Sequence, residues 1–582
     1  MSEVDPILLS VLARAFKSAT DEMSICLEKT TRSPILCEAK DFVTGLYDGE
    51  GNMLEQTENL PILSFSLGPV CKYILDYYGD DIHPGDVIFH NDVFSMGNQN
   101  NDVAVYKPIF FEDELVAWSA AKGHQADIGG AVAGGYNPNA TEVWQEALRI
   151  PPVKVYEKGK LRRDVWDLIF ANIRFDIVRE DLRAEIGACV VGERRMLGLL
   201  EKYGRECFDT HKRALFDATR KMMEAEIRTI PNGVYRGEST IYYDGRNHGK
   251  EYRIRVEIEV ADCRIRFDYS KTDPQSNAFV NGTYTSSASA TVLTLLQMVN
   301  PDIPHNQGMV EPIEIVIPEG TILNAAYPAA TTYGNHLCPA NADAITRALA
   351  PVIPDRVTAG WNHLLCSLTT GQDPRKHGRQ DKYVDICFMG LKGGSGAMQG
   401  VDGYDHIGMI DASGGLLDQD YEMFEQQTPH RLLQHEYLVD SAGAGEWRGG
   451  LGVETVFEIG SDDTQMVVFG DGDIEPAFGL EGGGAGSLNA IELVFPDGPD
   501  GGKKTPASLD LLHGVPRGTI YRQRAGGGGG HGDPKRRPAA RVAEEVRNGV
   551  VSFEAAREIY SVVVDERTMT FDAEATEKLR LG

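Results

Sequence analysis

The spacing of hydrophobic and polar positions changes several times along the chain. In residues 5–31, apolar residues recur at three- and four-residue intervals without an interrupting glycine, which predicts one long amphipathic helix. From about residue 42 to residue 120, short β-like runs are separated by Gly, Asn and Asp. Residues 138–230 return to a helical spacing, which we interpret as scaffold.

Strands are predicted again in three later runs, 235–245, 252–270 and 312–318, where apolar and polar residues alternate. Alternation is typical of hairpins with one buried face. A further helix is predicted over 538–564, at the end of the chain.

The sequence contains 63 glycines, and glycine is concentrated after about residue 325, in runs such as "KGGSGAMQGVDG" and "AGGGGGHGDP". One interpretation is a flexible linker. The other is extended polyproline-II backbone packed against backbone, which only glycine permits at close range. We favour the second because Trp447, Arg448 and His531 are interspersed, and linkers seldom carry such residues.

The predicted fold is therefore mixed and mainly β. A helix and β-sheets are expected over 1–325, with a helical insertion at 138–230. Residues 326–582 are expected to form a Gly-rich polyproline-II and β region with a C-terminal helix. At 582 residues, more than one compact unit is needed.

Composition and charge exclude several classes of function. The net charge of −29 opposes binding to nucleic acid. No run reaches the ~18 apolar residues of a membrane helix, and the N-terminus lacks a secretion-signal layout, so we expect a cytoplasmic protein without membrane contact. The nine cysteines form no C-x-x-C pair, which argues against a thiolate metal site. No phosphate-binding loop is present, so the chain is not expected to bind nucleotide itself.

Carboxylate and imidazole side chains gather between residues 38 and 130, where they are candidate metal ligands. Asp102 begins one β-like run and His124 ends the next, so a hairpin would bring the two together. The alternative is that these residues only cap turns and satisfy local hydrogen bonds. The full set of candidate ligands is Asp41, Asp92, Asp102, His124 and Asp127.

Taken together, these segments resemble the hydantoinase B/oxoprolinase family, which also includes subunits of acetone and acetophenone carboxylases. The resemblance is carried by "DPILLSVLARAFKSATDEM", "HPGDVIFHNDVF", "AAKGHQADIGG", "DSAGAGEWRGGLG" and the C-terminal "AGGGGGHGDPKRRP". It implies a barrel-like fold with a polyproline-II bundle. It also implies an A-type partner subunit that holds ATP and Mg²⁺ and phosphorylates a small-molecule substrate.

The resemblance also implies a metal site. The ligands of metal-bearing relatives fall on Asp41, Gln99, Asp102 and His124 of this sequence. Gln99 stands where the family pattern has histidine, and a neutral amide is a far weaker ligand than imidazole. We therefore expect a degenerate site, empty or holding Mn, Mg or Zn through Asp41, Asp102 and His124.

Gln99 leads us to favour a biotin-independent ketone carboxylase resembling acetophenone carboxylase, which would shelter the coupling of a phosphorylated enol with activated bicarbonate. Such a complex would include a small zinc-binding subunit. His124 would exchange protons, with Asp102 and Asp127 as further catalytic candidates. Hydrogen-bond donors to oxyanions would be Asn98, Gln99, Asn100 and Asn101.

Two alternatives stay open. In the first, the chain is the B subunit of an ATP-dependent hydantoinase, 5-oxoprolinase or lactamase that hydrolyses a cyclic amide. In the second, it is a scaffold without catalytic residues. Three further residues lie in Gly-flanked loops: Asn335, His336 and Asp402. They could line the cleft, but we favour turn-forming roles for them.

Overall fold

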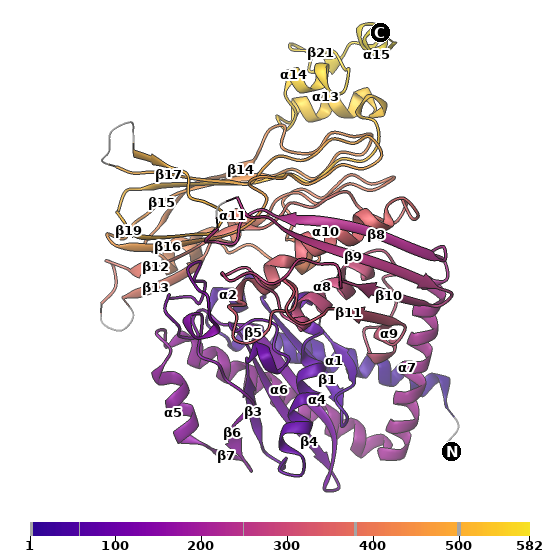
Figure 1. Ribbon diagram of the computed structural model, residues 1–582, viewed down its shortest axis with the longest axis vertical. Helices are drawn as coiled ribbons and strands as arrows, with labels where there is room; N and C mark the ends of the chain where they lie inside the picture. The colour runs from indigo at the N-terminus through magenta and orange to yellow at the C-terminus, as the bar shows by residue number, and fades with distance from the viewer. Residues whose placement is uncertain (1–3, 58, 248, 378–380, 497–501, 582) are drawn as a thin grey trace. The chain divides into compact units, whose positions relative to one another are not determined.

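The computed structural model describes residues 4–57, 59–247, 249–377, 381–496 and 502–581. The chain divides into two compact units, each described separately (Figure 1). Unit 1 comprises residues 1–240, 252–348 and 411–417. Unit 2 comprises residues 241–251, 349–410 and 418–582.

Unit 1 contains the first ten helices and eleven strands, apart from the last residue of each of α10 and β8. Its helices are α1 (Pro6–Thr30), α2 (Pro34–Cys37), α3 (Pro61–Ser64), α4 (Leu67–Tyr78), α5 (Arg163–Ala171), α6 (Ile177–Tyr203), α7 (Arg205–Ile227), α8 (Tyr284–Leu296), α9 (Gln307–Val310) and α10 (Cys338–Leu349). Its strands are β1 (Phe42–Asp48), β2 (Met53–Gln56), β3 (Val87–His90), β4 (Asp102–Phe111), β5 (Glu114–His124), β6 (Val153–Glu157), β7 (Lys160–Leu161), β8 (Gly233–Ile241), β9 (Tyr252–Ala261), β10 (Arg264–Asp268) and β11 (Ile313–Val316).

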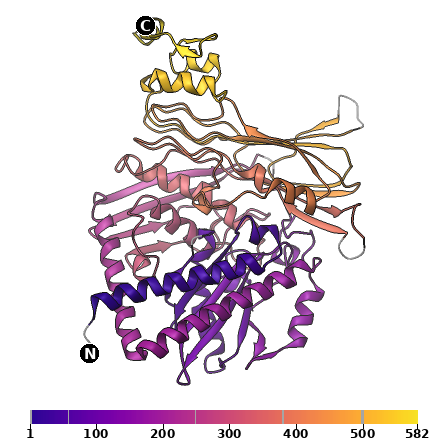
Figure 2. The same cartoon turned by 180° about the vertical axis from the view of Figure 1, so that it is seen from behind.

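The main sheet of unit 1 has the antiparallel order β2-β1-β5-β4-β3-β6-β7. The predicted N-terminal helix is confirmed as α1, which begins after Asp5, whose side chain accepts a hydrogen bond from the backbone N–H of Ile7. Figure 2 shows α1 and α6 lying side by side. Helix α6 packs on β4 and β5, so one face of the hairpin that they form is covered by helix.

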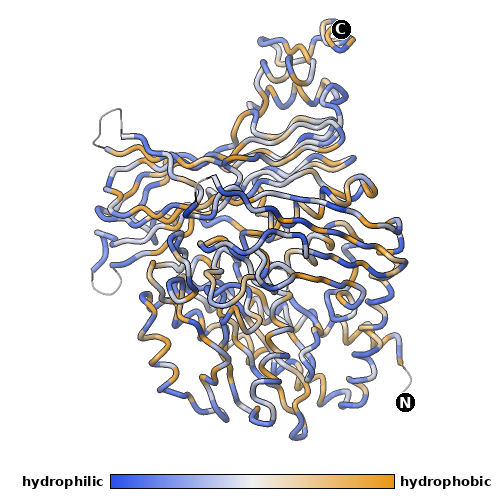
Figure 3. The backbone as a smooth tube through the Cα atoms, viewed as in Figure 1, coloured by the Kyte–Doolittle hydropathy of each residue, from blue (hydrophilic) through white to orange (hydrophobic). Residues whose placement is uncertain are grey.

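A second, four-stranded sheet of unit 1 has the order β11-β10-β9-β8. The burial of β8 and β9 alternates residue by residue, and along β9 apolar and charged residues alternate in the same way, as the hydropathy colouring of the backbone in Figure 3 illustrates. The predicted strands are therefore confirmed. The pair β10–β11 is parallel, and α8 to α10 lie in the same unit.

Unit 2 is built on two further sheets, ordered β13-β12-β16-β19 and β14-β15-β20-β17-β18. Buried side chains from both, including Leu365 and Met466 of the first and Phe457 and Tyr521 of the second, form one core cluster, so the sheets pack face to face. Its elements are β12 (Leu365–Gln372), β13 (Lys382–Ile386), α11 (Phe388–Leu391), α12 (Tyr421–Gln427), β14 (Arg431–Tyr437), β15 (Val453–Glu458), β16 (Thr464–Gly470), β17 (Ala490–Val494), β18 (Lys503–Lys504), β19 (Asp510–Val515), β20 (Ile520–Ala525), α13 (Ala539–Arg547), α14 (Phe553–Glu558), β21 (Val564–Asp565), β22 (Thr570–Phe571) and α15 (Ala573–Leu581).

These sheets are open, because each has two edge strands among the described residues. The expected mixture of helix and strand is confirmed. The prediction of a mainly β fold is wrong, because helical residues outnumber strand residues, and the described residues form no closed barrel. The predicted C-terminal helix is two helices, α13 and α14, because Gly549 takes a positive φ of 72° between them. Among the described residues, no helix is both long and apolar enough to span a membrane.

The glycine-rich segments of unit 2 pack backbone against backbone. The N–H of Gly394 donates to the carbonyl oxygen of Gly526 over 3.0 Å, and that of Gly528 to Gly450 over 3.0 Å. A Cβ added at Gly528 would lie 1.9 Å from the carbonyl oxygen of Ser395. These glycines are therefore required by close packing, while polyproline-II geometry stays a prediction.

Replacing Gly528 with alanine should lower the free energy of unfolding by about 1–3 kcal/mol, because the packed backbone has no room for a methyl group. Gly187 in the middle of α6 is the matched control, since no atom lies within 4 Å of its added Cβ. Gly187→Ala should instead stabilise the protein by about 0.5–1 kcal/mol. Denaturant unfolding of both variants measures the contrast, and equal effects would contradict the packing argument.

Candidate functional site

The β4–β5 hairpin brings two candidate residues of unit 1 together. Asp102 is the first residue of β4 and His124 the last of β5, and the strand register places them directly opposite each other. Asp102 Oδ1 lies 2.8 Å from His124 Nδ1, and both side chains are buried. The prediction that a hairpin brings Asp102 and His124 together is therefore confirmed.

The carboxylate fixes the protonation pattern of the imidazole. An ionised Asp102 only accepts hydrogen bonds, so His124 Nδ1 donates and the lone pair of neutral His124 is on Nε2. That Nε2 is buried and has no hydrogen-bond partner among the described residues. Burial acts to lower the pKa of His124, but its hydrogen bond to Asp102 and the charge of Asp41 outweigh that effect and raise the pKa.

A chain of hydrogen bonds holds the Asp102 oxygen that does not contact His124. This oxygen, Oδ2, accepts from Asn98 Nδ2 over 2.6 Å and from Asn335 Nδ2 over 3.0 Å. Asn98 Oδ1 in turn accepts from the buried Lys122 Nζ over 2.7 Å. Burial lowers the pKa of Lys122 to about 8, although Asp102 and Glu185 act to raise it. This network surrounds Asp102 with hydrogen-bond donors.

Asp41 lies beside the pair, in the short connection between α2 and β1. The backbone N–H of His124 donates to its carbonyl oxygen over 3.0 Å, and Asp41 Oδ1 is buried without a hydrogen-bond partner among the described residues. Burial raises the pKa of Asp41 to about 7, with His124 acting to lower it and the charges of Asp102 and Asp411 acting to raise it further. Burial likewise raises the pKa of Asp411 to about 7.

Gln99 is held by the protein rather than presented as a ligand. Its Nε2 donates to Tyr136 Oη over 3.1 Å and to the carbonyl oxygen of Thr332, and its Oε1 accepts from Asn335 over 3.1 Å. Tyr136 also stacks on the His124 ring, with ring centroids 6.0 Å apart. Gln99 therefore shapes the walls around His124.

The residues as arranged only partly fit the metal ion that the resemblance implies. The buried atoms His124 Nε2 and Asp41 Oδ1 have no hydrogen-bond partner among the described residues, but the side-chain oxygens of the other two candidate ligands are already engaged. Both Asp102 oxygens accept hydrogen bonds from His124, Asn98 and Asn335, and the Gln99 oxygen accepts from Asn335. In addition, Asp41, Asp102 and His124 are not among the described groups of three that place one ligand atom each within 4.8 Å of one another. We therefore assign no chemical step to a metal at this position.

Two other predicted ligands have structural partners. Asp127 pairs with Arg174 Nη1 over 3.0 Å and accepts backbone hydrogen bonds from Gly129 and Gly134, so it clamps a loop. Asp92 forms a bidentate pair with Arg149, with both distances 3.0 Å, and both residues line a cavity of about 600 Å³. The structure does not bring either carboxylate into contact with His124.

Most of the amides predicted as oxyanion donors are already bonded within the protein. Asn98 donates to Asp102, Gln99 to Thr332, and Asn101 Nδ2 to the carbonyl oxygen of Gly134 over 2.8 Å. The buried amide of Asn100 makes no hydrogen bond with a described residue. The donors of this segment therefore orient the site more than they face a reacting oxygen.

Sequence reasoning missed several residues of the site. Asn335 and His336, interpreted as turn formers, reach it from the 3₁₀ helix at Thr332–Leu337, where His336 Nε2 lies 3.1 Å from Tyr136 Oη. Lys122 lies inside the continuously buried part of strand β5, where no local pattern indicates a function. Asp402 lies in unit 2, paired with Arg537 over 2.8 Å.

Comparisons with known proteins place the chain. The pattern that defines the hydantoinase B/oxoprolinase family matches residues 5–534. The chain belongs to this family. The caprolactamase subunit beta of Pseudomonas jessenii is 36% identical over 579 residues, which cover 97% of each chain. The family assignment made from the sequence is thus confirmed, and the chain is a component of an enzyme.

Solved structures of the family agree with the fold. The crystal structure of the ATP-dependent caprolactamase from Pseudomonas jessenii matches with a TM-score of 0.92 and 34% identity, covering 100% of both chains. A nucleotide-free acetone carboxylase matches with a TM-score of 0.88 over 99% of this chain and 82% of the other. At 21% identity, the second likeness shows the fold alone.

Proposed function

We propose that this chain is the B-type subunit of an ATP-dependent hydrolase that opens a cyclic amide. The observation that carries the proposal is the 36% identity to a caprolactamase subunit over nearly the whole of both chains. The sequence analysis ranked this reading second, behind a ketone carboxylase, on the strength of Gln99 alone. The comparisons support the hydrolase better, because the carboxylase likeness is limited to the fold.

We propose that the reaction is divided between two subunits. An A-type partner binds ATP and Mg²⁺ and transfers the γ-phosphoryl group to the amide oxygen, which makes the ring carbon electrophilic. In this subunit, His124 Nε2 accepts a proton from water as the water attacks that carbon. The same nitrogen returns the proton to the ring nitrogen as the C–N bond breaks, and a second water hydrolyses the resulting acyl phosphate.

Asp102 is the positioning residue of this step. It holds His124 Nδ1 so that Nε2 accepts, and it stabilises the imidazolium that forms during the attack. The burial of both side chains strengthens that interaction, because little water screens it. All nine cysteines are free thiols, in keeping with the cytoplasmic location that we propose.

The test is reconstitution with the A-type partner. The complex should convert a lactam, a hydantoin or 5-oxoproline to its ring-opened product with ATP and Mg²⁺, measured by product and ADP release. Neither subunit alone should do so. Incorporation of labelled bicarbonate into a ketone, without ring opening of any cyclic amide, would overturn the proposal, and so would ATP hydrolysis by this chain alone.

A further inference from the structure

A second cluster of ligand-type side chains lies in unit 2, and the proposed hydrolysis does not use it. His406, Asp418 and His435 each place one ligand atom within 4.8 Å of the others. His406 Nε2 lies 3.2 Å from Asp418 Oδ2, and His435 Nε2 lies 3.9 Å from the same oxygen. Two imidazole nitrogens thus converge on one carboxylate oxygen.

The surroundings show that the converging nitrogen of His435 is an acceptor. His435 lies on β14 directly opposite Thr455 of β15, and its Nδ1 is 2.9 Å from Thr455 Oγ1. The Thr455 hydroxyl donates its only proton to the carbonyl oxygen of Met389 over 3.3 Å, so it accepts from His435 Nδ1–H. Nδ1 is then the protonated nitrogen, and the lone pair on Nε2 points at the cluster.

Both converging nitrogens are left without hydrogen bonds. His406 Nε2 and His435 Nε2 are buried and have no hydrogen-bond partner among the described residues. Burial lowers the pKa of each imidazole to about 4, so both rings are neutral at neutral pH and each has one nitrogen with a free lone pair. A bound cation would satisfy these two buried nitrogens.

The carboxylate is held from its other side. Lys392 Nζ lies 3.1 Å from Asp418 Oδ1, so the ammonium fixes one oxygen and leaves Oδ2 for the two imidazoles. Hydrogen bonds and charges that orient ligands in this way are typical of metal sites. His406 also takes a positive φ of 47°, an uncommon backbone conformation for histidine that is found at functional sites.

We propose that His406, Asp418 and His435 bind one divalent first-row transition metal ion, with Zn²⁺ as the expected ion. Two imidazoles and one carboxylate form the ligand set of open zinc and non-haem iron sites, in which further positions are left for water or substrate. The His406 and Asp418 side chains are 18% and 21% exposed, so the site has an open side. The proposal is independent of the reaction assigned to His124.

The experiment uses the full chain, purified with its partner and stripped of metal by a chelator. Zn²⁺ is then titrated, and Co²⁺ serves as a visible probe because its absorption reports the coordination. The wild-type protein should bind one ion at this site with a dissociation constant below ~10 µM. His435→Gln and Asp418→Asn should each weaken binding by at least ~100-fold. Thr455→Val should weaken it by ~10–100-fold through the lost orientation of His435.

Two controls separate this site from other sources of binding. His513→Gln, at an exposed histidine on β19 of the same unit, should leave the affinity unchanged. Asp41→Asn should also leave it unchanged, since Asp41 belongs to the His124 site in unit 1. Circular dichroism checks that each variant is folded, and Asp418→Asn keeps the side-chain shape. Affinity that survives both His435→Gln and Asp418→Asn, or a wild-type protein that binds neither ion, would overturn the proposal.

Discussion

Replacing His124 with glutamine should reduce the rate of ring opening by about 10²–10⁴-fold, the usual contribution of a positioned acid–base group. Glutamine keeps a polar side chain of similar length but cannot exchange a proton at neutral pH. The phosphorylation step on the partner should continue, so ADP release should persist or become uncoupled from product formation. Product and ADP are therefore measured together.

The control for this variant is another buried histidine of unit 1. His211 of α7 accepts a hydrogen bond from the backbone N–H of Asp5 and contacts the carbonyl oxygen of Cys207, so its role is local. His211→Gln should change the rate of ring opening by less than about threefold. Ring opening by His124→Gln within tenfold of the wild-type rate would remove His124 from the chemistry.

The pH dependence of the rate in the Asp102→Asn variant distinguishes a role of Asp102 in positioning His124 from a purely structural role. The base must be neutral, so the rate should rise with pH as His124 loses its proton, at a pKa above the ordinary value of about 6.5. Removing the Asp102 charge should move this limb to lower pH and lower the maximum rate by up to ~10⁴-fold. A purely structural role for Asp102 would lower the rate without moving the limb.

Local sequence was sufficient to predict the hairpin and its two key residues. A run that begins at Asp102 and one that ends at His124 define a β-hairpin, and hairpin geometry places such ends opposite each other. The same reasoning applies to α1, whose apolar spacing and N-terminal Asp5–Pro6 pair define a helix start. These features depend on neighbours in the chain, which the sequence displays directly.

The rest of the site depends on contacts that no local pattern displays. Asn335 bonds to Asp102 from 233 positions away along the chain. The Gln99 amide was expected to face the cleft, yet its orientation is set by Thr332 and Tyr136. Likewise, His406, Asp418 and His435 come from two loops and an edge strand with no ligand motif. Side-chain direction and long-range packing decide such sites.

Gln99 also shows how a single residue can mislead a functional inference. Its presence in place of histidine weakens the case for a metal, and on this ground we favoured a carboxylase over a hydrolase from the sequence. In the structure, the Asp102–His124 pair offers a base for water without a metal ligand at position 99. The substitution thus bears on how water is activated and says little about whether the reaction is a hydrolysis.

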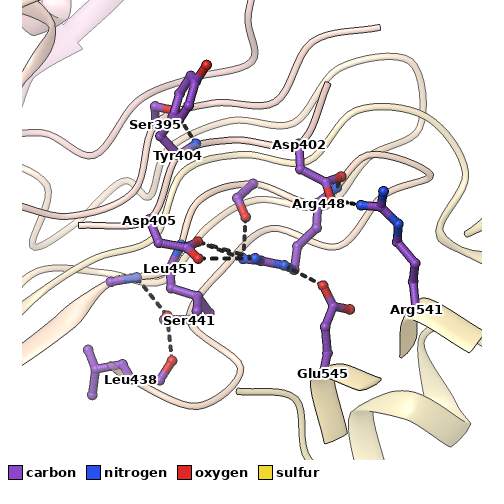
Figure 4. A network of polar contacts seen from close by, with 12 residues as sticks. Ser395, Asp402, Tyr404, Asp405, Leu438, Ser441, Arg448, Leu451, Arg541 and Glu545 are labelled. Atoms are coloured by element: carbon purple, nitrogen blue, oxygen red, sulfur yellow. Dashed lines mark hydrogen bonds and ion pairs between the residues drawn. The ribbon is translucent and has the colours of Figure 1, made fainter. Parts of the chain in front are cut away.

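The C-terminal helices of unit 2 are joined to the glycine segments by buried charges. Arg448 of a glycine segment pairs with Asp405 over 3.2 Å and with Glu545 of α13 over 2.9 Å (Figure 4). Arg537, which is 1% exposed, joins the same helix through Glu545 over 2.7 Å and the loop through Asp402 over 2.8 Å. Two guanidinium groups therefore share three carboxylates in a site with little water.

Arg537→Met should lower the free energy of unfolding by about 3–5 kcal/mol, because it leaves the partly buried Asp402 and Glu545 carboxylates without the buried guanidinium that compensates their charge. Arg541 is the matched control: it contacts the same Asp402 over 3.2 Å, but its side chain is 65% exposed. Arg541→Met should cost less than about 1 kcal/mol, as exposed ion pairs do. Denaturant unfolding followed by tryptophan fluorescence measures both variants.

The difference in unfolding free energy between the wild type and Arg537→Met should depend on pH, and this dependence identifies its cause. Burial acts to raise the pKa of Asp402, but the hydrogen bonds and charge of Arg537 outweigh it and hold the pKa below its ordinary value. The stabilisation is therefore fully present above the unfolded-state pKa of about 3.9 and is lost as pH falls through the lower folded-state value. The gap between wild type and Arg537→Met should shrink over that acid range. A gap that stays constant would mean that Arg537 stabilises the unit by packing of its aliphatic stem rather than by charge.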